Sequence, residues 1–182
     1  VSFVYRQSTK YENELNKRVA QPIEKIPVHI CDHYDLYNRA DSFRLKVCSK
    51  ALKIIVNILL VKYIYLLINI IRLRRILRDR RIDILHVNNG GYPGAYSALA
   101  MVIAARLCGI RKVVFVVNNI AQRYLPPERW LDYFFDRTVI RGVAVFVTGS
   151  QYAGEKLHEN LGVPISKISC IHNGISPRAI TE

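Results

Sequence analysis

The chain has 182 residues, of which 51% are hydrophobic, and its 27 lysines and arginines against 14 acidic residues give a formal net charge of +13. This length supports one domain with a sizeable core. Since the chain has no internal repeat and no low-complexity linker, we expect no domain boundary inside it. Residues 1–81 carry 17 basic and 7 acidic side chains, and residues 82–182 carry 10 and 7. The surplus in the first half suggests an anionic surface as a neighbour.

The four cysteines are widely scattered and form no C-x-x-C pair, which is typical of a reduced, cytoplasmic protein with buried thiols. The chain opens directly in a predicted strand without an initiator Met, so we expect it to be a piece of a longer protein. A signal peptide upstream of Val1 would not be visible.

The first part of the chain predicts two strands, Val1–Tyr5 and Ile26–Ile30, separated by a surface helix over Tyr11–Ala20 that stops before Pro22. The polar segment Cys31–Ser42 predicts a loop.

A long helix is predicted over Phe43–Arg81, which lacks Pro and Gly, with apolar residues dominating Leu52–Ile71. Its core, Ile54–Ile71, is about membrane-spanning length. Lys62 near the centre opposes a span, because a central Lys costs about 2.5–3.5 kcal/mol on insertion scales.

Three interpretations of this helix stay open: packing on the sheet with a solvated basic end, lying in the membrane interface with arginines on anionic headgroups, or a true span. For the interfacial interpretation the membrane-facing candidates are Lys62, Arg72, Arg74, Arg75 and Arg78.

The centre of the chain predicts a strand, a turn and a helix. The strand covers Ile82–Val87, and Asn88–Gly91 is expected to end it, since Asn and Gly tolerate positive φ. Pro93 suits the first turn of a helix that runs from Gly94 to Leu107.

A second buried strand, Lys112–Val117, completes a βαβ unit after a stop at Gly109. Such units predict a Rossmann-like, doubly wound, mostly parallel α/β sheet flanked by helices. Ligands of these sheets bind beyond the carboxyl ends of the strands, an edge lined here by Asn88–Tyr92 and Asn118–Asn119.

An aromatic-rich helix follows within Ile120–Arg141, and we expect its aromatic residues to be core: Trp130, Tyr133, Phe134 and Phe135. The remaining elements are a strand over Val143–Val147, a helix over Gln151–Leu161 capped by Ser150, and a strand over Ile168–Ile171.

The ordered stretches RIDILHVNN, KVVFVVNN and VFVTGSQYAGEKLHENLGVPISKISCIHNGI resemble the N-terminal half of a family 4 glycosyltransferase of the GT-B fold, over about Ile82–Ile175. The positions that match the family pattern are Asp83, His86, Asn118, Asn119, Ser150, Gly162, Pro164, Asn173 and Gly174. The Asn-Gly-Gly-Tyr-Pro-Gly and Val-Val-Asn-Asn variants resemble bacterial enzymes that build capsular or exopolysaccharide chains.

Two departures from the family pattern matter. The family's first strand and glycine-rich loop are not recognisable and are expected upstream of Val1. Asn118 stands where many relatives have a His, and an amide can hydrogen-bond a sugar hydroxyl but cannot shuttle protons near pH 7.

The resemblance implies a hexosyltransferase that moves a sugar from a nucleotide-sugar donor, a UDP- or GDP-sugar, to an acceptor hydroxyl, usually with retention. The donor would bind mainly to a C-terminal domain beyond Glu182. Residues 1–182 would then be a single acceptor-side domain, without a cofactor of its own and inactive alone. The expected partners are this second domain, a glycan or lipid-linked acceptor and an anionic membrane surface, on the inner face of the plasma membrane.

Each cleft candidate also has a purely structural interpretation. Asn88, Asn89, Gly90, Gly91 and Tyr92 could line the cleft or only shape a tight turn. Asn118 and Asn119 follow an apolar strand and face the same cleft, where their two side-chain amides need hydrogen-bond partners.

The other candidates are weaker. Arg123 with Tyr124 could meet phosphate or sugar, although a solvated surface pair is the simpler interpretation, and Ser150 could be only a helix cap. Asn173–Gly174 is expected at the interdomain turn, close to the donor, and His86 is expected to be a satisfied core histidine.

Catalytic residues are not identified. The five histidines have no metal-ligand spacing, and P-loop, G-x-G-x-x-G and G-x-S-x-G patterns are missing, so we expect no metal site and no Ser nucleophile. Two alternatives remain: a GT-B sugar-nucleotide epimerase domain, and a non-enzymatic basic module that binds membrane or nucleic acid. Nucleic acid is not the expected partner, because the arginine cluster adjoins an apolar run rather than interleaved aromatics.

Overall fold

The computed structural model describes residues 1–18, 23–32, 35, 61–124, 129, 131–172 and 174. The strands are β1 (Ser2–Arg6), β2 (Glu24–Val28), β3 (Leu85–Asn89), β4 (Val113–Val117), β5 (Val145–Thr148) and β6 (Ile168–Cys170). The helices are α1 (Thr9–Arg18), α4 (Val61–Arg78), α5 (Tyr96–Leu107), α6 (Asp132–Gly142) and α7 (Gln151–Leu161), with a 3-10 turn, η1 (Ile165–Lys167), before β6.

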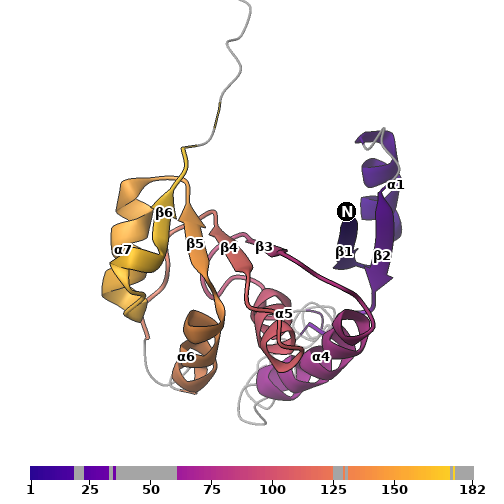
Figure 1. Ribbon diagram of the computed structural model, residues 1–182, viewed down its shortest axis with the longest axis horizontal. Helices are drawn as coiled ribbons and strands as arrows, with labels where there is room; N and C mark the ends of the chain where they lie inside the picture. The colour runs from indigo at the N-terminus through magenta and orange to yellow at the C-terminus, as the bar shows by residue number, and fades with distance from the viewer. Residues whose placement is uncertain are drawn as a thin grey trace, which may run out of the picture.

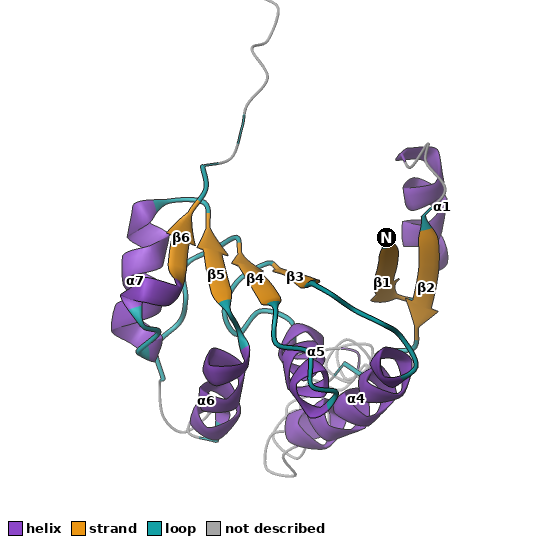
Figure 2. Cartoon of the chain, in the orientation of Figure 1, coloured by secondary structure: helices purple, strands orange, loops and turns teal. Residues whose placement is uncertain are grey.

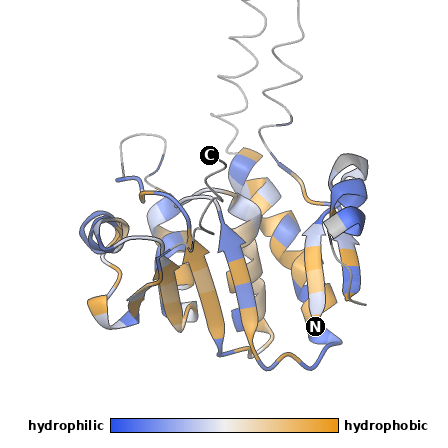
Figure 3. Cartoon of the chain, turned by 90° about the horizontal axis from the view of Figure 1, so that it is seen from above, coloured by the Kyte–Doolittle hydropathy of each residue, from blue (hydrophilic) through white to orange (hydrophobic). Residues whose placement is uncertain are grey.

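The strands form two parallel sheets, one of order β1-β2 and one of order β3-β4-β5-β6 (Figure 1). Helices follow the strands in the chain and flank the larger sheet (Figure 2). Val113, Phe115 and Val117, which share one face of β4, are fully buried, whereas Val114 and Val116 on the other face are half-buried. The central strands are mostly apolar in Figure 3. The predicted Rossmann-like α/β fold is therefore confirmed.

Small side chains let the helices pack closely. Ala100, Ala104 and Ala105 of α5 are completely buried, and α5 packs on both α4 and α6. At α7, a methyl group added to Gly154 would come within 3.0 Å of Ile168 Cγ2 and 3.3 Å of Thr148 Oγ1. The missing side chain thus sets how closely α7 approaches β5 and β6.

The long predicted helix is confirmed over Val61–Arg78, and residues 43–60 of that prediction lie outside the described part. Tyr63, Leu66, Ile70, Leu73 and Leu77 point into the core, as in an amphipathic helix packed on its neighbours. Among the described residues, no helix is both long enough and apolar enough to cross a membrane.

The boundary between β3 and α5 differs from the prediction. β3 begins at Leu85 and continues through Asn88 and Asn89, because both residues pair with β4. α5 begins only at Tyr96, so Pro93 lies in the preceding loop, after a cis Tyr92–Pro93 bond, rather than in the first helical turn.

Three burial predictions were wrong. Tyr133 and Phe134 are 43% and 67% exposed, because α6 turns Asp132, Asp136, Val139 and Ile140 to the inside instead. His86 is exposed, since β3 alternates and turns Val87 and Asn89 inward. Cys31, Cys108 and Cys170 are partly exposed rather than buried.

Candidate active site

The carboxyl ends of β3 and β4 bring the predicted asparagines together. The register places Asn88 beside Val116 and Asn89 beside Val117. The side-chain amide of Asn118 donates to Asn88 Oδ1 at 2.7 Å and to the Asn89 carbonyl at 3.1 Å. Asn88 and Asn118 are exposed, so this amide pair faces solvent. We call Asn88, Gly90, Gly91, Asn118 and Asn119 the rim.

The two segments that follow β3 and β4 continue side by side beyond the strands. Tyr92 and Ala121 form a parallel bridge, in which the Gln122 N–H donates to the Tyr92 carbonyl at 2.9 Å. A methyl group placed on Gly91 would contact Asn119 Cβ at 3.6 Å. The glycines and the exposed asparagines therefore share one edge of the sheet, as the parallel-strand rule predicts.

Asn89 has a structural role and does not face the cleft. It is 2% exposed, its Oδ1 accepts from the Ala95 N–H at 2.9 Å, and its Nδ2 donates to the Pro93 carbonyl at 2.8 Å. Both ends of its amide are thus used to hold the loop that leads into α5. The prediction that this side chain lines the cleft was wrong, since alternation along β3 turns it inward.

Tyr92 was also misplaced among the cleft residues. Its side chain is 1% exposed, and its hydroxyl donates to Asp136 Oδ1 at 3.0 Å. The ring packs against Phe115 of β4, so Tyr92 forms the floor beneath the rim rather than part of it.

Of the remaining predicted site residues that the structure describes, none bonds directly to the amide pair. Arg123 is exposed and donates to Asn160 Oδ1 at 3.0 Å, and Ser150 Oγ accepts from the Ala153 N–H at 3.2 Å as the cap of α7. Gly174 is exposed, and Asn173 lies outside the described residues.

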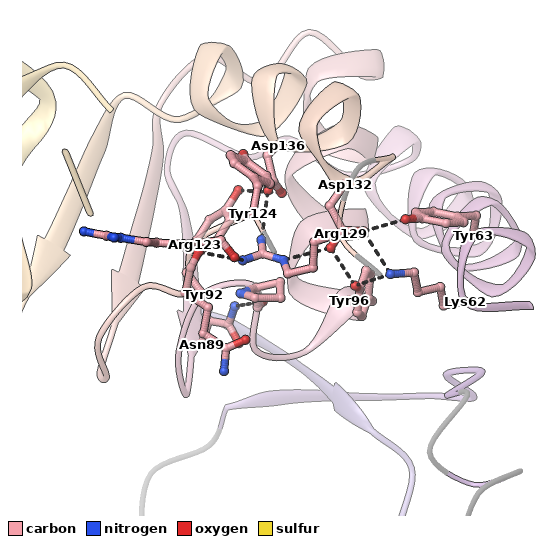
Figure 4. A network of polar contacts seen from close by, with 12 residues as sticks. Lys62, Tyr63, Asn89, Tyr92, Tyr96, Arg123, Tyr124, Arg129, Asp132 and Asp136 are labelled. Carbon is pink, nitrogen blue, oxygen red and sulfur yellow. Dashed lines mark hydrogen bonds and ion pairs between the residues drawn. The ribbon is translucent and has the colours of Figure 1, made fainter. Parts of the chain in front are cut away.

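Behind the rim lies a buried polar network that the sequence analysis did not identify (Figure 4). Its centre is Arg129, whose Nε donates to Asp132 at 3.0 Å and whose Nη2 donates to Asp136 at 3.2 Å. Arg129 Nη1 donates to the carbonyls of Gln122 and Arg123 at 2.6 and 3.1 Å. The fork of the guanidinium thereby joins α6 to the segment after β4.

Each aspartate accepts hydrogen bonds from two tyrosines. Asp132 accepts from Tyr63 at 2.9 Å and from Tyr96 at 3.0 Å. Asp136 accepts from Tyr92 at 3.0 Å and from Tyr124 at 2.9 Å. Burial is the largest cause that raises the pKa of each of these four hydroxyls, so they stay protonated and donate.

Burial also raises the pKa of Asp136 to about 6, although the hydrogen bonds from Tyr124 and Tyr92 and the charge of Arg129 oppose the shift. A carboxylate with no exposed surface is costly unless it is paired, and here three donors surround it. The spacing of Asp132 and Asp136, one helical turn apart among aromatic residues, is the signal in the sequence that could have identified the network.

Two of the five predicted membrane-facing residues turn into the protein. Lys62 forms an ion pair with buried Asp132 at 3.3 Å, and Arg72 donates to the His29 carbonyl at 2.9 Å. Arg74, Arg75 and Arg78 are exposed, and they continue a face of α4 whose exposed apolar residues are Ile64, Leu67 and Ile71.

These observations define a class: a Rossmann-like α/β domain with an exposed amide pair at the carboxyl edge of its parallel sheet. Within the described residues, no three His, Cys, Asp or Glu side chains gather as a metal site. The family model of the glycosyl transferase 4-like domain matches residues 52–174, and the chain belongs to this family. No curated protein and no solved structure matches the chain.

Proposed function

We propose that this glycosyltransferase domain forms the acceptor side of an enzyme that transfers a hexose from a UDP- or GDP-sugar to a membrane-associated or polysaccharide acceptor, with retention. The exposed Asn88–Asn118 pair carries the proposal, because amides both donate to and accept from sugar hydroxyls. Gly90 and Gly91 beside the pair leave the backbone accessible. The sequence variants at these positions support a role in bacterial capsule or exopolysaccharide synthesis.

From the family resemblance, we propose that the donor nucleotide is bound mainly by a second, C-terminal domain. The rim residues carry no group that shuttles protons near neutral pH. The 182-residue chain alone should then not transfer sugar. Measurable transfer from UDP-glucose or GDP-mannose by the purified chain would contradict this.

Titration of the 15N-labelled chain with neutral disaccharides, UDP-glucose and GDP-mannose tests the acceptor role. We expect the disaccharides to shift the side-chain amide signals of Asn88 and Asn118, and Asn118→Ala to abolish the response. Asn16→Ala on α1, which removes another exposed asparagine, should have no effect. Shifts confined to other regions would overturn the assignment.

We further propose a cytoplasmic enzyme on the inner face of the plasma membrane, held there by α4. Its exposed face is apolar at Ile64, Leu67 and Ile71 and basic at Arg74, Arg75 and Arg78. This order suits a helix that buries its apolar half among lipid tails and places its arginines on anionic headgroups.

Co-sedimentation with phosphatidylglycerol and phosphatidylcholine vesicles tests this location. Replacing the three arginines by Gln should weaken binding to anionic vesicles on the order of 100-fold, since each contributes about 1 kcal/mol. The matched control replaces the exposed Arg106, Arg111 and Arg141, which removes the same charge elsewhere. If both triple variants lose the same affinity for anionic vesicles, binding depends on net charge alone and not on α4. If the chain binds an RNA oligonucleotide in preference to the vesicles, a nucleic-acid module is favoured.

A further inference from the structure

The two segments that carry the rim are anchored to the same buried carboxylate. Tyr92, in the segment after β3, donates to Asp136 Oδ1 at 3.0 Å, and Tyr124, in the segment after β4, donates to Asp136 Oδ2 at 2.9 Å. Figure 4 shows both hydroxyls converging on this residue of α6. One side chain thus joins the segment after β3 to the segment that leads from β4 to α6.

The segment after β4 is held a second time through Arg129. The guanidinium donates to Asp136 and, from Nη1, to the carbonyls of Gln122 and Arg123. Gln122 in turn donates its N–H to the Tyr92 carbonyl at 2.9 Å. The hydrogen bonds therefore form a closed ring that includes both loops, Arg129 and Asp136.

Asp136 has no exposed surface, so it cannot touch a ligand at the rim. Buried charges are costly, and an apolar residue of similar volume is often at least as stabilising at such a site. A carboxylate at this position is best explained by a structural role, in which it fixes the positions of Tyr92, Tyr124 and Arg129.

We propose that Asp136 is a positioning residue that sets the spacing between the Gly90–Gly91 and Asn118–Asn119 sides of the rim. Its relevance to acceptor binding rests on the proposed function, whereas the geometric effect does not.

Asp132 provides a matched control on the same helix, one turn earlier. It is 1% exposed and likewise accepts from Arg129 and two tyrosines. Its tyrosines, Tyr63 and Tyr96, lie on α4 and α5 rather than on the rim segments. Without Asp132, Arg129 can still donate to Asp136 and to the Gln122 carbonyl, so loss of Asp132 should weaken the fold without moving the rim.

The experiment compares Asp136→Asn with Asp132→Asn in the full chain, using the NMR signals of the Asn88 and Asn118 side-chain amides and hydrogen exchange of the Gln122 N–H. We expect both variants to lose stability, but only Asp136→Asn to shift the rim amides. We also expect this variant to raise Gln122 exchange about fivefold to tenfold beyond the change in global stability. Equal responses in the two variants, or no rim response to Asp136→Asn, would overturn the proposal.

Milder variants keep the test decisive if an aspartate variant does not fold. Tyr92→Phe and Tyr124→Phe each remove one hydroxyl that reaches Asp136, and Tyr63→Phe removes one that reaches Asp132. The rim signals should respond to the first two and not to the third, and a uniform response would refute the assignment. These readouts need no sugar, so a failed disaccharide titration would count against the proposed function and not against the role of Asp136.

Discussion

Replacing Asn89 by Ala should destabilise the protein much more than replacing its neighbour Asn88. Asn89 is 2% exposed and makes two side-chain hydrogen bonds, to the Ala95 N–H at 2.9 Å and to the Pro93 carbonyl at 2.8 Å. Each contributes about 1 kcal/mol net, so Asn89→Ala should cost about 2 kcal/mol. Asn88 is exposed and shares one side-chain bond with Asn118, so Asn88→Ala should cost well under about 1 kcal/mol.

Urea denaturation followed by circular dichroism measures the difference. With a slope of about 2 kcal/mol per molar urea, the Asn89→Ala midpoint should fall by about 1 M, at unchanged slope. Equal shifts for the two variants would refute the assignment of Asn89 to the fold and of Asn88 to the surface. A large loss of disaccharide response in Asn88→Ala alone would support the same division.

Four further predictions concern single positions. Gly94→Ala should cost more than about 2 kcal/mol, because φ is +56° and the new methyl would clash with Asn89 Oδ1. Gly109→Ala, at φ +78° but in open space, should cost only the backbone strain, about 1 kcal/mol, in the same urea titration. The pKa of Asp136, about 6 in the folded chain, exceeds its unfolded value of about 3.9. The folded state therefore binds more protons between these values, and this group should lower stability by up to about 3 kcal/mol as pH rises from about 4 to about 6. Urea titrations at pH 4.5, 5.5 and 6.5 should show that slope in the wild type and a flatter one in Asp136→Asn; parallel curves would contradict the shift. Ser150→Ala should lower stability by about 1 kcal/mol through loss of the α7 cap, measured as a reduced melting temperature, whereas an unchanged melting temperature would show that the cap contributes nothing.

Elements with strong local signals could be predicted from the sequence to within a few residues. The helix over Gln151–Leu161 has the predicted bounds, because Ser150 caps its start and Gly162, at φ +68°, ends it. The meeting of Asn88 with Asn118 could also be predicted, because parallel strands end at one edge.

The direction of individual side chains could not be predicted in the same way. Asn89 is the last residue of β3 and Tyr92 lies in the loop that follows, where a shift of one residue turns a side chain from solvent to core. Lys62 was assigned to the surface by its charge, although its partner, Asp132, lies 70 positions away in the chain. Such a contact depends on how α5 packs against both α4 and α6, which no local pattern encodes.

The close approach of α7 has a consequence for the end of β5. Because a methyl added at Gly154 would lie 3.0 Å from Ile168 Cγ2, a larger residue there requires a shift of Ile168 or of the first turns of the helix away from the sheet. Ser150 would be carried outward with them, since it is bonded to the same turn. The lack of a side chain at Gly154 therefore allows the start of α7 to lie close to β5 and β6.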